Sequence, residues 1–326
     1  MPYSIAYRAP MALMLLLAGG LAHADALSIK IENDIVSTGE DGHYTGGLEI
    51  IYGFAPEADH WTDGLSRLLL DDRGPADNVA YRLGHQIYTP EDIEQVSLVR
   101  DDRPYAGLLF GGVSLFSETP GQAVRTTRGV HLDVGLVGPA AGGETIQRRL
   151  HEWTDSDEPR GWDNQLENEP FINVGIQQRW WQQHTPGGLE FEYGPMLGGA
   201  IGNLYTFAAT GVGMRLGHNL DRSFSIPSVT PAQSGSQYFT EGRGFAWYGF
   251  ANLEGRYMAH NLLLDGNTFT DSHSVDRREW VGDASLGVAL TWSRWQLSFV
   301  NVWRTREFEE QRQSDHFGSL TISTLL

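Results

Sequence analysis

A glutamine and a histidine stand four residues apart in the segment 140–155, which reads AAGGETIQRRLHEWTD. Apolar residues recur in it at helical spacing, as Ile146, Leu150 and Trp153. If the segment is a helix, Gln147 and His151 project side by side from it. An imidazole can accept a proton from water near neutral pH, which makes His151 a candidate general base. A structural role is the alternative, and it is the usual one for an isolated histidine.

A second polar group lies where two strand-like segments meet. Asn33 and Asp34 close the first segment, and Thr45 opens the next. Asn33 has the same parity as the apolar residues of its strand, Leu27, Ile29 and Ile31. Thr45 has the opposite parity to the apolar residues after it, so a bulge or a strand end has to turn it toward the same site. Asn and Asp also favour turns, which is the structural alternative.

The sequence does not indicate a covalent nucleophile. Ser114, in GVSLF, lacks the second glycine of a G-x-S-x-G motif. P-loop, H-E-x-x-H and EF-hand patterns are also missing. A Ser–His pair assembled in space stays open, because such pairs are recognised by geometry. The pattern favours water as the nucleophile and a histidine as its base.

Residues 1–24 have the features of an export signal. Arg8 precedes an apolar run, and Ala22-His23-Ala24 has the form of a cleavage site. We therefore expect one mature domain over 25–326. The sequence has no cysteine, so disulfides and thiol chemistry are excluded. The net charge is −18, which argues against nucleic acid as a partner because phosphate backbones attract basic surfaces.

Apolar and polar residues alternate over long stretches of the mature sequence. Between Trp280 and Trp292 the even positions are apolar, whereas the odd positions include Asp283, Ser285 and Thr291. An apolar face with a tryptophan at each end is typical of a barrel wall with aromatic girdles. No apolar run of 18 residues follows the signal, so helical membrane spans are excluded.

Twelve strand-like segments can be counted, at 27–35, 43–55, 78–88, 104–117, 124–137, 171–183, 187–200, 204–217, 244–260, 277–292, 294–306 and 316–326. An even number is what a bacterial barrel requires. We predict an all-β fold, a twelve-stranded antiparallel transmembrane β-barrel with a short helix in an extracellular loop. The polar segments 218–241 and 263–276 are also expected to be extracellular. A secreted β-sandwich is the alternative, and the non-aromatic end Leu325-Leu326 counts against a barrel.

Several motifs together resemble those of the outer-membrane lipid A 3′-O-deacylases. They occur in the family's order as Asn33-Asp34, His43-Tyr44-Thr45-Gly46-Gly47, Asp102-Arg103-Pro104-Tyr105-Ala106-Gly107, the run 138–151 and the run 162–169. The resemblance implies an outer-membrane barrel that hydrolyses the ester of the 3′-linked acyloxyacyl chain of lipid A in the outer leaflet. It also implies a calcium-dependent site between the barrel wall and a helix of an extracellular loop.

The resemblance assigns roles to individual residues. His151 would activate water, Gln147 would lie beside it, and Asn33, Asp34 and Thr45 would form the polar wall. Asp34 and Asn33 offer the hard oxygen ligands that Ca²⁺ prefers. Arg100 or Arg103 could contact a lipid phosphate, although a structural role fits the Asp102-Arg103 motif at least as well. A passive porin or lipid-binding barrel, and a serine-dependent phospholipase barrel, remain as alternatives.

Overall fold

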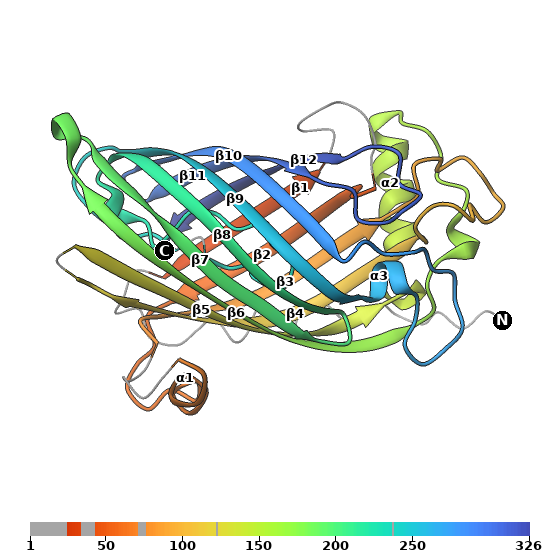
Figure 1. Ribbon diagram of the computed structural model, residues 1–326, viewed down its shortest axis with the longest axis horizontal. Helices are drawn as coiled ribbons and strands as arrows, with labels where there is room; N and C mark the ends of the chain where they lie inside the picture. The colour runs from red at the N-terminus through yellow and green to blue at the C-terminus, as the bar shows by residue number, and fades with distance from the viewer. Residues whose placement is uncertain (1–24, 34–42, 71–75, 122, 237) are drawn as a thin grey trace, which may run out of the picture.

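Twelve antiparallel strands close into a barrel in which β1 pairs with β12 (Figure 1). The computed structural model describes residues 25–33, 43–70, 76–121, 123–236 and 238–326. The strands are β1 (Ala26–Asn33), β2 (Gly46–Phe54), β3 (Asn78–Tyr88), β4 (Ala106–Thr119), β5 (Val124–Val137), β6 (Glu169–His184), β7 (Glu190–Gly202), β8 (Tyr205–His218), β9 (Ala246–Asn261), β10 (Trp280–Trp292), β11 (Trp295–Arg304) and β12 (Asp315–Leu325). The predicted fold and strand number are confirmed. The predicted signal, 1–24, and Asp34 lie outside the described residues.

Among the described residues, three α-helices lie outside the barrel wall, named α1 (Asp63–Leu69), α2 (Gly143–Thr154) and α3 (Leu262–Asp265). Helix α2 confirms the helix expected at 140–155, although it begins later, because a 3-10 turn over Pro139–Ala141 precedes it. Gly142 joins the two with a φ of 77°, a backbone conformation that favours glycine. The alternation pattern did not predict α1 and α3, which have 7 and 4 residues. No helix in the described ranges is long and apolar enough to cross a membrane.

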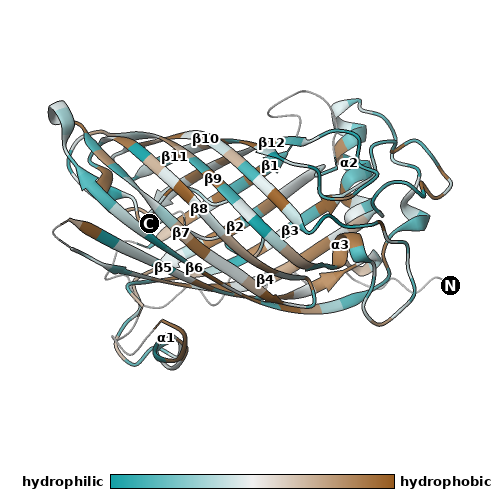
Figure 2. Ribbon diagram, in the orientation of Figure 1, coloured by the Kyte–Doolittle hydropathy of each residue, from teal (hydrophilic) through white to brown (hydrophobic). Residues whose placement is uncertain are grey.

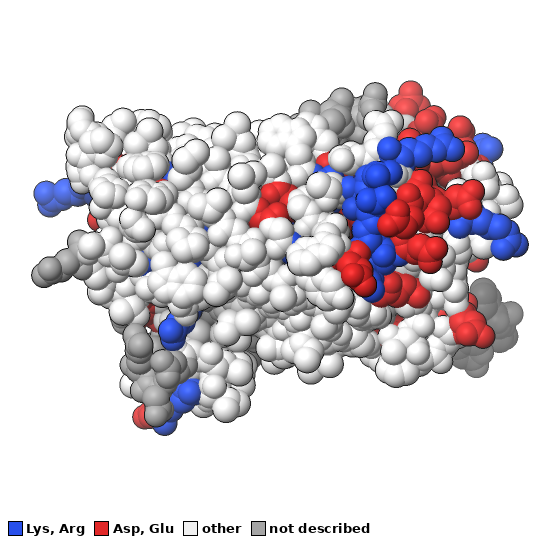
Figure 3. Space-filling model, in the orientation of Figure 1, with Lys and Arg blue, Asp and Glu red and all other residues white. Residues whose placement is uncertain are grey.

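The wall is apolar on its outer face and polar on its inner face. In β1, Ile29 and Ile31 point outward and are exposed, whereas Lys30 and Glu32 point inward and are buried. Figure 3 shows that charged side chains gather at one end of the molecule and that the outer surface of the wall is almost free of them. Figure 2 shows apolar residues along the strands. The alternation in the sequence therefore reflects the inside and the outside of a closed sheet.

The two ends of the barrel differ. The α2 end carries the connections 89–105, 138–168, 262–279 and 305–314. The opposite end, called here the C-terminal end, carries the C-terminus, α1 and the connection 219–245 (Figure 1). The segments 218–241 and 263–276, expected on one side, therefore lie at opposite ends of the barrel. The two segments therefore cannot both be extracellular, because consecutive connections of an antiparallel barrel lie at opposite ends of it.

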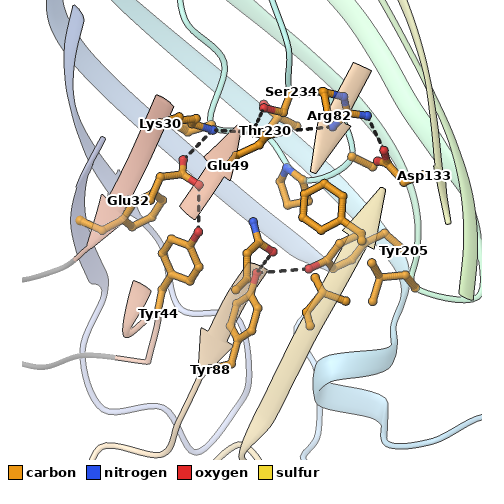
Figure 4. A pocket seen from close by; sticks show the side chains of 18 of the residues that line it. Lys30, Glu32, Tyr44, Glu49, Arg82, Tyr88, Asp133, Tyr205, Thr230 and Ser234 are labelled. Carbon is orange, nitrogen blue, oxygen red and sulfur yellow. Dashed lines mark hydrogen bonds and ion pairs between the residues drawn. The ribbon is translucent and has the colours of Figure 1, made fainter. Parts of the chain in front are cut away.

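The connection 219–245 folds back into the barrel and fills it. Its residues 225–236, called here the plug, hydrogen-bond to inward side chains of several strands. Thr230 Oγ1 donates to Glu254 Oε2 at 2.9 Å, and Ser114 Oγ donates to the carbonyl oxygen of Ser234 at 3.1 Å. Ser234 also bonds to Glu49, as Figure 4 shows. The cavity left beside the plug measures only about 60 Å³, which argues against a passive porin.

Removing the plug should convert the closed barrel into a pore. Ser223 and Phe239 form a β-bridge at the base of the plug, so residues 226–236 can be replaced by a short Gly-Ser turn. We expect stable ion conductance from this variant in planar lipid bilayers and none from the unaltered protein, because the plug fills the lumen. Thr230→Ala is the matched control and should stay closed, since the rest of the plug remains. Equal conductance of all three proteins would contradict the assignment.

Candidate functional site

Helix α2 is held against the barrel by close backbone contact with β4. The N–H of Gly138 donates to the carbonyl oxygen of Gly107 at 2.9 Å. A Cβ atom on Gly107 would lie 2.9 Å from the backbone nitrogen of Gly143, so a side chain there would push the helix away. His85 on β3 bonds through Nε2 to the carbonyl oxygen of Ala141 at 3.0 Å. The glycines of the sequence motif thus place the start of α2 directly on the wall.

Gln147 is buried on the inner side of α2. Its Oε1 accepts a hydrogen bond of 2.8 Å from Nε1 of Trp162, which is itself buried. Its Nε2 has no hydrogen-bond partner within the described part of the chain. A buried amide donor without a partner costs free energy, about 1–3 kcal/mol. The side chain is therefore fixed in orientation with one donor still to be satisfied.

His151 lies one turn further along the same helix and is half-buried. Its Nδ1 is 2.5 Å from the carbonyl oxygen of Asp157. A carbonyl oxygen can only accept, so Nδ1 must carry the proton of the neutral ring. The unprotonated nitrogen is then Nε2, which is able to take a proton from a water molecule. This contact fixes the tautomer that a general base requires.

The apolar face of α2 points away from the barrel. Ile146, Leu150 and Trp153 are all exposed, and Trp153 is exposed over 85% of its surface. The helix thus buries a polar side chain, Gln147, and exposes its apolar ones, which reverses the usual arrangement of a helix on a protein in water. Such a surface fits a lipid environment beside the wall.

Asn33 and Thr45 form a second pair at the same end of the barrel. Nδ2 of Asn33 donates to the carbonyl oxygen of Thr45 at 2.5 Å. The Thr45 hydroxyl is buried and bonds to that of Thr89 at 2.8 Å. Strand β2 begins only at Gly46, so Thr45 lies at a strand end, as its parity required. The hydrogen bonds found for His151 and Gln147 run to Asp157 and Trp162, and not to this pair.

The two arginines predicted to contact lipid phosphate differ in accessibility. Arg103 is buried, with its guanidinium 4.7 Å from the centre of the Tyr88 ring and its Nη1 3.7 Å from Glu307 Oε2. The Asp102 carboxylate accepts from the backbone N–H of Arg103 but pairs with a different side chain. This burial favours a structural role for Arg103. Arg100 is exposed and remains accessible to a ligand.

The side chain that pairs with Asp102 is His43, which the sequence did not single out as a site residue. Nε2 of His43 lies 3.2 Å from Asp102 Oδ1, and Nδ1 lies 2.8 Å from Asp315 Oδ1. Burial lowers the pKa of His43, but its hydrogen bonds to the two carboxylates more than offset this and raise the pKa to about 9. His43 stands in the motif His43-Tyr44-Thr45, and that position was the available signal.

A cavity of about 790 Å³ opens beside this histidine. It is lined by His43 and Asp102, by Arg100, and by Asp157, whose carbonyl oxygen orients His151. Further carboxylates line the same cavity, those of Glu91, Asp92, Glu94, Asp101 and Glu310. Figure 3 shows the resulting mixture of acidic and basic groups at the α2 end. The cavity links the His43 cluster to the neighbourhood of α2.

A serine and a histidine do meet in this fold, but in a place unsuited to lipid chemistry. Ser114 Oγ lies 2.8 Å from His131 Nδ1, and both residues are buried inside the barrel. The serine hydroxyl donates to the carbonyl oxygen of Ser234 in the plug. This pair anchors the plug, so it does not support a serine-dependent phospholipase.

The raised pKa of His43 predicts how stability depends on pH. A histidine with a pKa near 6.5 unfolded and about 9 folded adds stability that is complete below pH ~6.5 and lost as the pH rises through about 9. The contribution is of the order of 3 kcal/mol. Urea unfolding between pH 6.5 and 9.5 should show this decline, and His43→Gln should remove most of it. An unchanged pH dependence in the variant would contradict the assignment.

Comparison with known proteins agrees with these features. The sequence model of the family described as "Outer membrane protein LpxR" matches residues 7–326. No curated protein matches the chain. The solved structure of LpxR from Salmonella typhimurium superposes with a TM-score of 0.78, at 21% sequence identity, and the alignment covers 92% of this chain and 100% of that one.

Two further barrels are less similar. The β domain of the Bordetella autotransporter BrkA gives a TM-score of 0.47 at 8% identity, covering 93% of this chain and 99% of that one. The translocator domain of NalP from Neisseria meningitidis gives 0.39 at 9% identity, covering 96% and 91%. The match of the family model over nearly the whole chain shows that this protein belongs to the LpxR family of outer membrane proteins, the lipid A 3′-O-deacylase family that its motifs resemble.

Proposed function

We propose that this outer membrane protein is a lipid A 3′-O-deacylase that hydrolyses the ester of the 3′-linked acyloxyacyl chain. Family membership supports the reaction class. The observation that carries the mechanism is the contact of His151 Nδ1 with the Asp157 carbonyl oxygen at 2.5 Å. It leaves Nε2 as the proton acceptor, which would meet the lipid ester. The α2 end is then the extracellular end.

The reaction begins with a water molecule hydrogen-bonded to His151 Nε2. The imidazole takes a proton as the water oxygen attacks the ester carbonyl carbon, and it returns that proton to the departing sugar oxygen. The fatty acid leaves as a carboxylic acid, which releases its proton to water, and no acyl-enzyme forms. Among the described residues, Gln147 lies one turn from His151 on α2, and its buried Nε2 has no partner; this donor would stabilise the negative charge developing on the carbonyl oxygen once the ester carbonyl is seated against it.

Calcium is proposed as the second source of stabilisation. Asn33 and Asp34 would hold it, because amide and carboxylate oxygens are the donors that Ca²⁺ prefers. The Asn33 amide is oriented by the hydrogen bond that its Nδ2 donates to the carbonyl oxygen of Thr45. In the described ranges no group of three or more acidic, histidine or cysteine side chains could hold a metal ion. A bound Ca²⁺ would lower the energy of the oxyanion by its charge.

The substrate would lie with its acyl chains against the wall and the exposed apolar face of α2. Leu150 and Trp153 offer apolar surface on the helix, and Ile29 and Ile31 offer it on β1. Arg100, which lines the cavity, would meet a phosphate there. The carboxylates of that cavity would repel a phosphate, so a divalent cation that bridges the two would stabilise the bound phosphate.

His151 can be tested directly. His151→Ala should lower acyl-chain release by at least about 100-fold, the typical contribution of a general base. Mass spectrometry of lipid A from cells carrying each variant measures the release. His218→Ala is the matched control, because this exposed histidine ends β8 at the opposite end of the barrel. Folding of each variant is verified by heat-modifiable gel mobility. A folded His151→Ala protein with full activity would refute this mechanism.

The calcium proposal has its own test. A chelator should abolish release by the purified protein in detergent micelles, and added Ca²⁺ should restore it better than Mg²⁺, which requires stricter octahedral geometry. Asp34→Asn should raise the calcium concentration for half-maximal activity by roughly tenfold or more, as loss of a metal contact commonly does. Activity that survives exhaustive chelation would remove calcium from the mechanism and leave His151 in place.

A further inference from the structure

Helix α1 lies beside the barrel wall and not beyond its end, although it belongs to the connection between β2 and β3 (Figure 1). Connections at this end of a bacterial barrel are usually short turns. Here the chain leaves β2 at Phe54, forms α1, and returns to β3 at Asn78. The position of the helix therefore needs a physical reason.

One face of α1 packs on the outer surface of the wall. Leu65 and Leu69 of the helix, with Leu70 behind it, contact outward residues of three neighbouring strands, Val79, Leu115 and Val130. These three residues are at most 3% exposed, whereas Leu83 on β3 and Leu109 on β4, which also point outward but lie nearer the α2 end, are each 40% exposed. The helix thus covers a patch of the surface that elsewhere on the same strands faces the membrane.

A side chain of the wall fixes the end of the helix. Arg128 points outward from β5, and its Nη1 donates to the carbonyl oxygen of Leu70 at 3.0 Å. This carbonyl belongs to the C-cap of α1, where backbone oxygens lack partners within the helix. The contact holds α1 at one depth along the barrel.

The other face of the segment presents apolar side chains that the described residues leave exposed. Leu68 is 77% exposed and Trp61 is 56% exposed. Trp61 stacks on Tyr81 of β3 and donates to its hydroxyl at 2.9 Å. Tyr52 and Phe54 of β2 and His60 continue the same cluster of rings. Aromatic rings of this kind gather where a membrane surface meets water.

We propose that the segment Trp61–Leu70 is a membrane-interface element that inserts Trp61 and Leu68 into the phospholipid leaflet at the C-terminal end of the barrel. Its exposed face continues the outer face of the wall, so the lipid that surrounds the strands surrounds the helix as well. Arg67, which is also exposed, then reaches the level of the phosphates, as basic residues beside an interfacial helix do. The proposal depends only on a membrane-embedded barrel and not on the catalytic mechanism.

The experiment uses the absence of cysteine from the sequence, which makes a single introduced thiol unambiguous. Leu68→Cys carries an environment-sensitive fluorophore, and the labelled full-length protein is reconstituted into phosphatidylcholine vesicles. Leu286→Cys, outward in the middle of β10, is the lipid reference, and Asp271→Cys, exposed in the connection after β9, is the aqueous reference. Quenching by brominated lipids and by iodide is then compared.

We expect the label at position 68 to be quenched by brominated lipids nearly as strongly as that at 286. We also expect iodide to quench it several-fold less than the label at 271. Trp61→Cys should behave in the same way, and heat-modifiable mobility shows that each variant is folded. Iodide quenching at 68 equal to that at 271 would overturn the proposal. So would a label that is water-accessible in vesicles but shielded in native outer membranes, since a protein partner would then cover α1.

Discussion

The pairing of β1 with β12 is the constraint on which the rest of this structure depends. A closed sheet has no edge strand, so no row of backbone groups is left unpaired in a membrane. Closure also places the apolar residues outside and the polar ones inside. The inward charges then need partners within the lumen, because an isolated buried charge is costly. The plug supplies some of these partners, as in the hydrogen bond from Thr230 to Glu254. It also fills the lumen.

At the α2 end, buried ion pairs hold the connections together, as backbone hydrogen bonds hold the strands of the wall together. His43 joins the connection before β2 to Asp102 in the connection before β4 and to Asp315 at the start of β12. Arg103 reaches Glu307 in the connection before β12. Removing one member of such a cluster leaves its partners charged and buried, which is strongly destabilising. These contacts keep three connections in one arrangement around the cavity beside α2.

Helices α1 and α2 lie against the wall near its opposite ends and contact it in a similar way. Each packs one face against outward residues of β3 or β4 and leaves apolar side chains uncovered, Leu68 on α1 and Trp153 on α2. In water such faces would favour association between molecules. Beside a barrel wall in a membrane they extend the surface that contacts lipid. At the α2 end this surface lies next to His151 and Gln147, so the chemistry and the lipid chains would meet at one place.

The sequence by itself determined the strands and their number, because residues that face lipid and lumen must alternate along every strand of such a wall. It also predicted α2 from its apolar spacing and indicated the family from its motifs. The destination of 218–241 was decided only by the tertiary structure, since a polar segment has the same composition in water and in a polar lumen. The partners of His43 and the burial of Arg103 could not be predicted from the sequence either. Asp315 lies 272 residues from His43 along the chain, and only closure of the barrel brings the two side chains together.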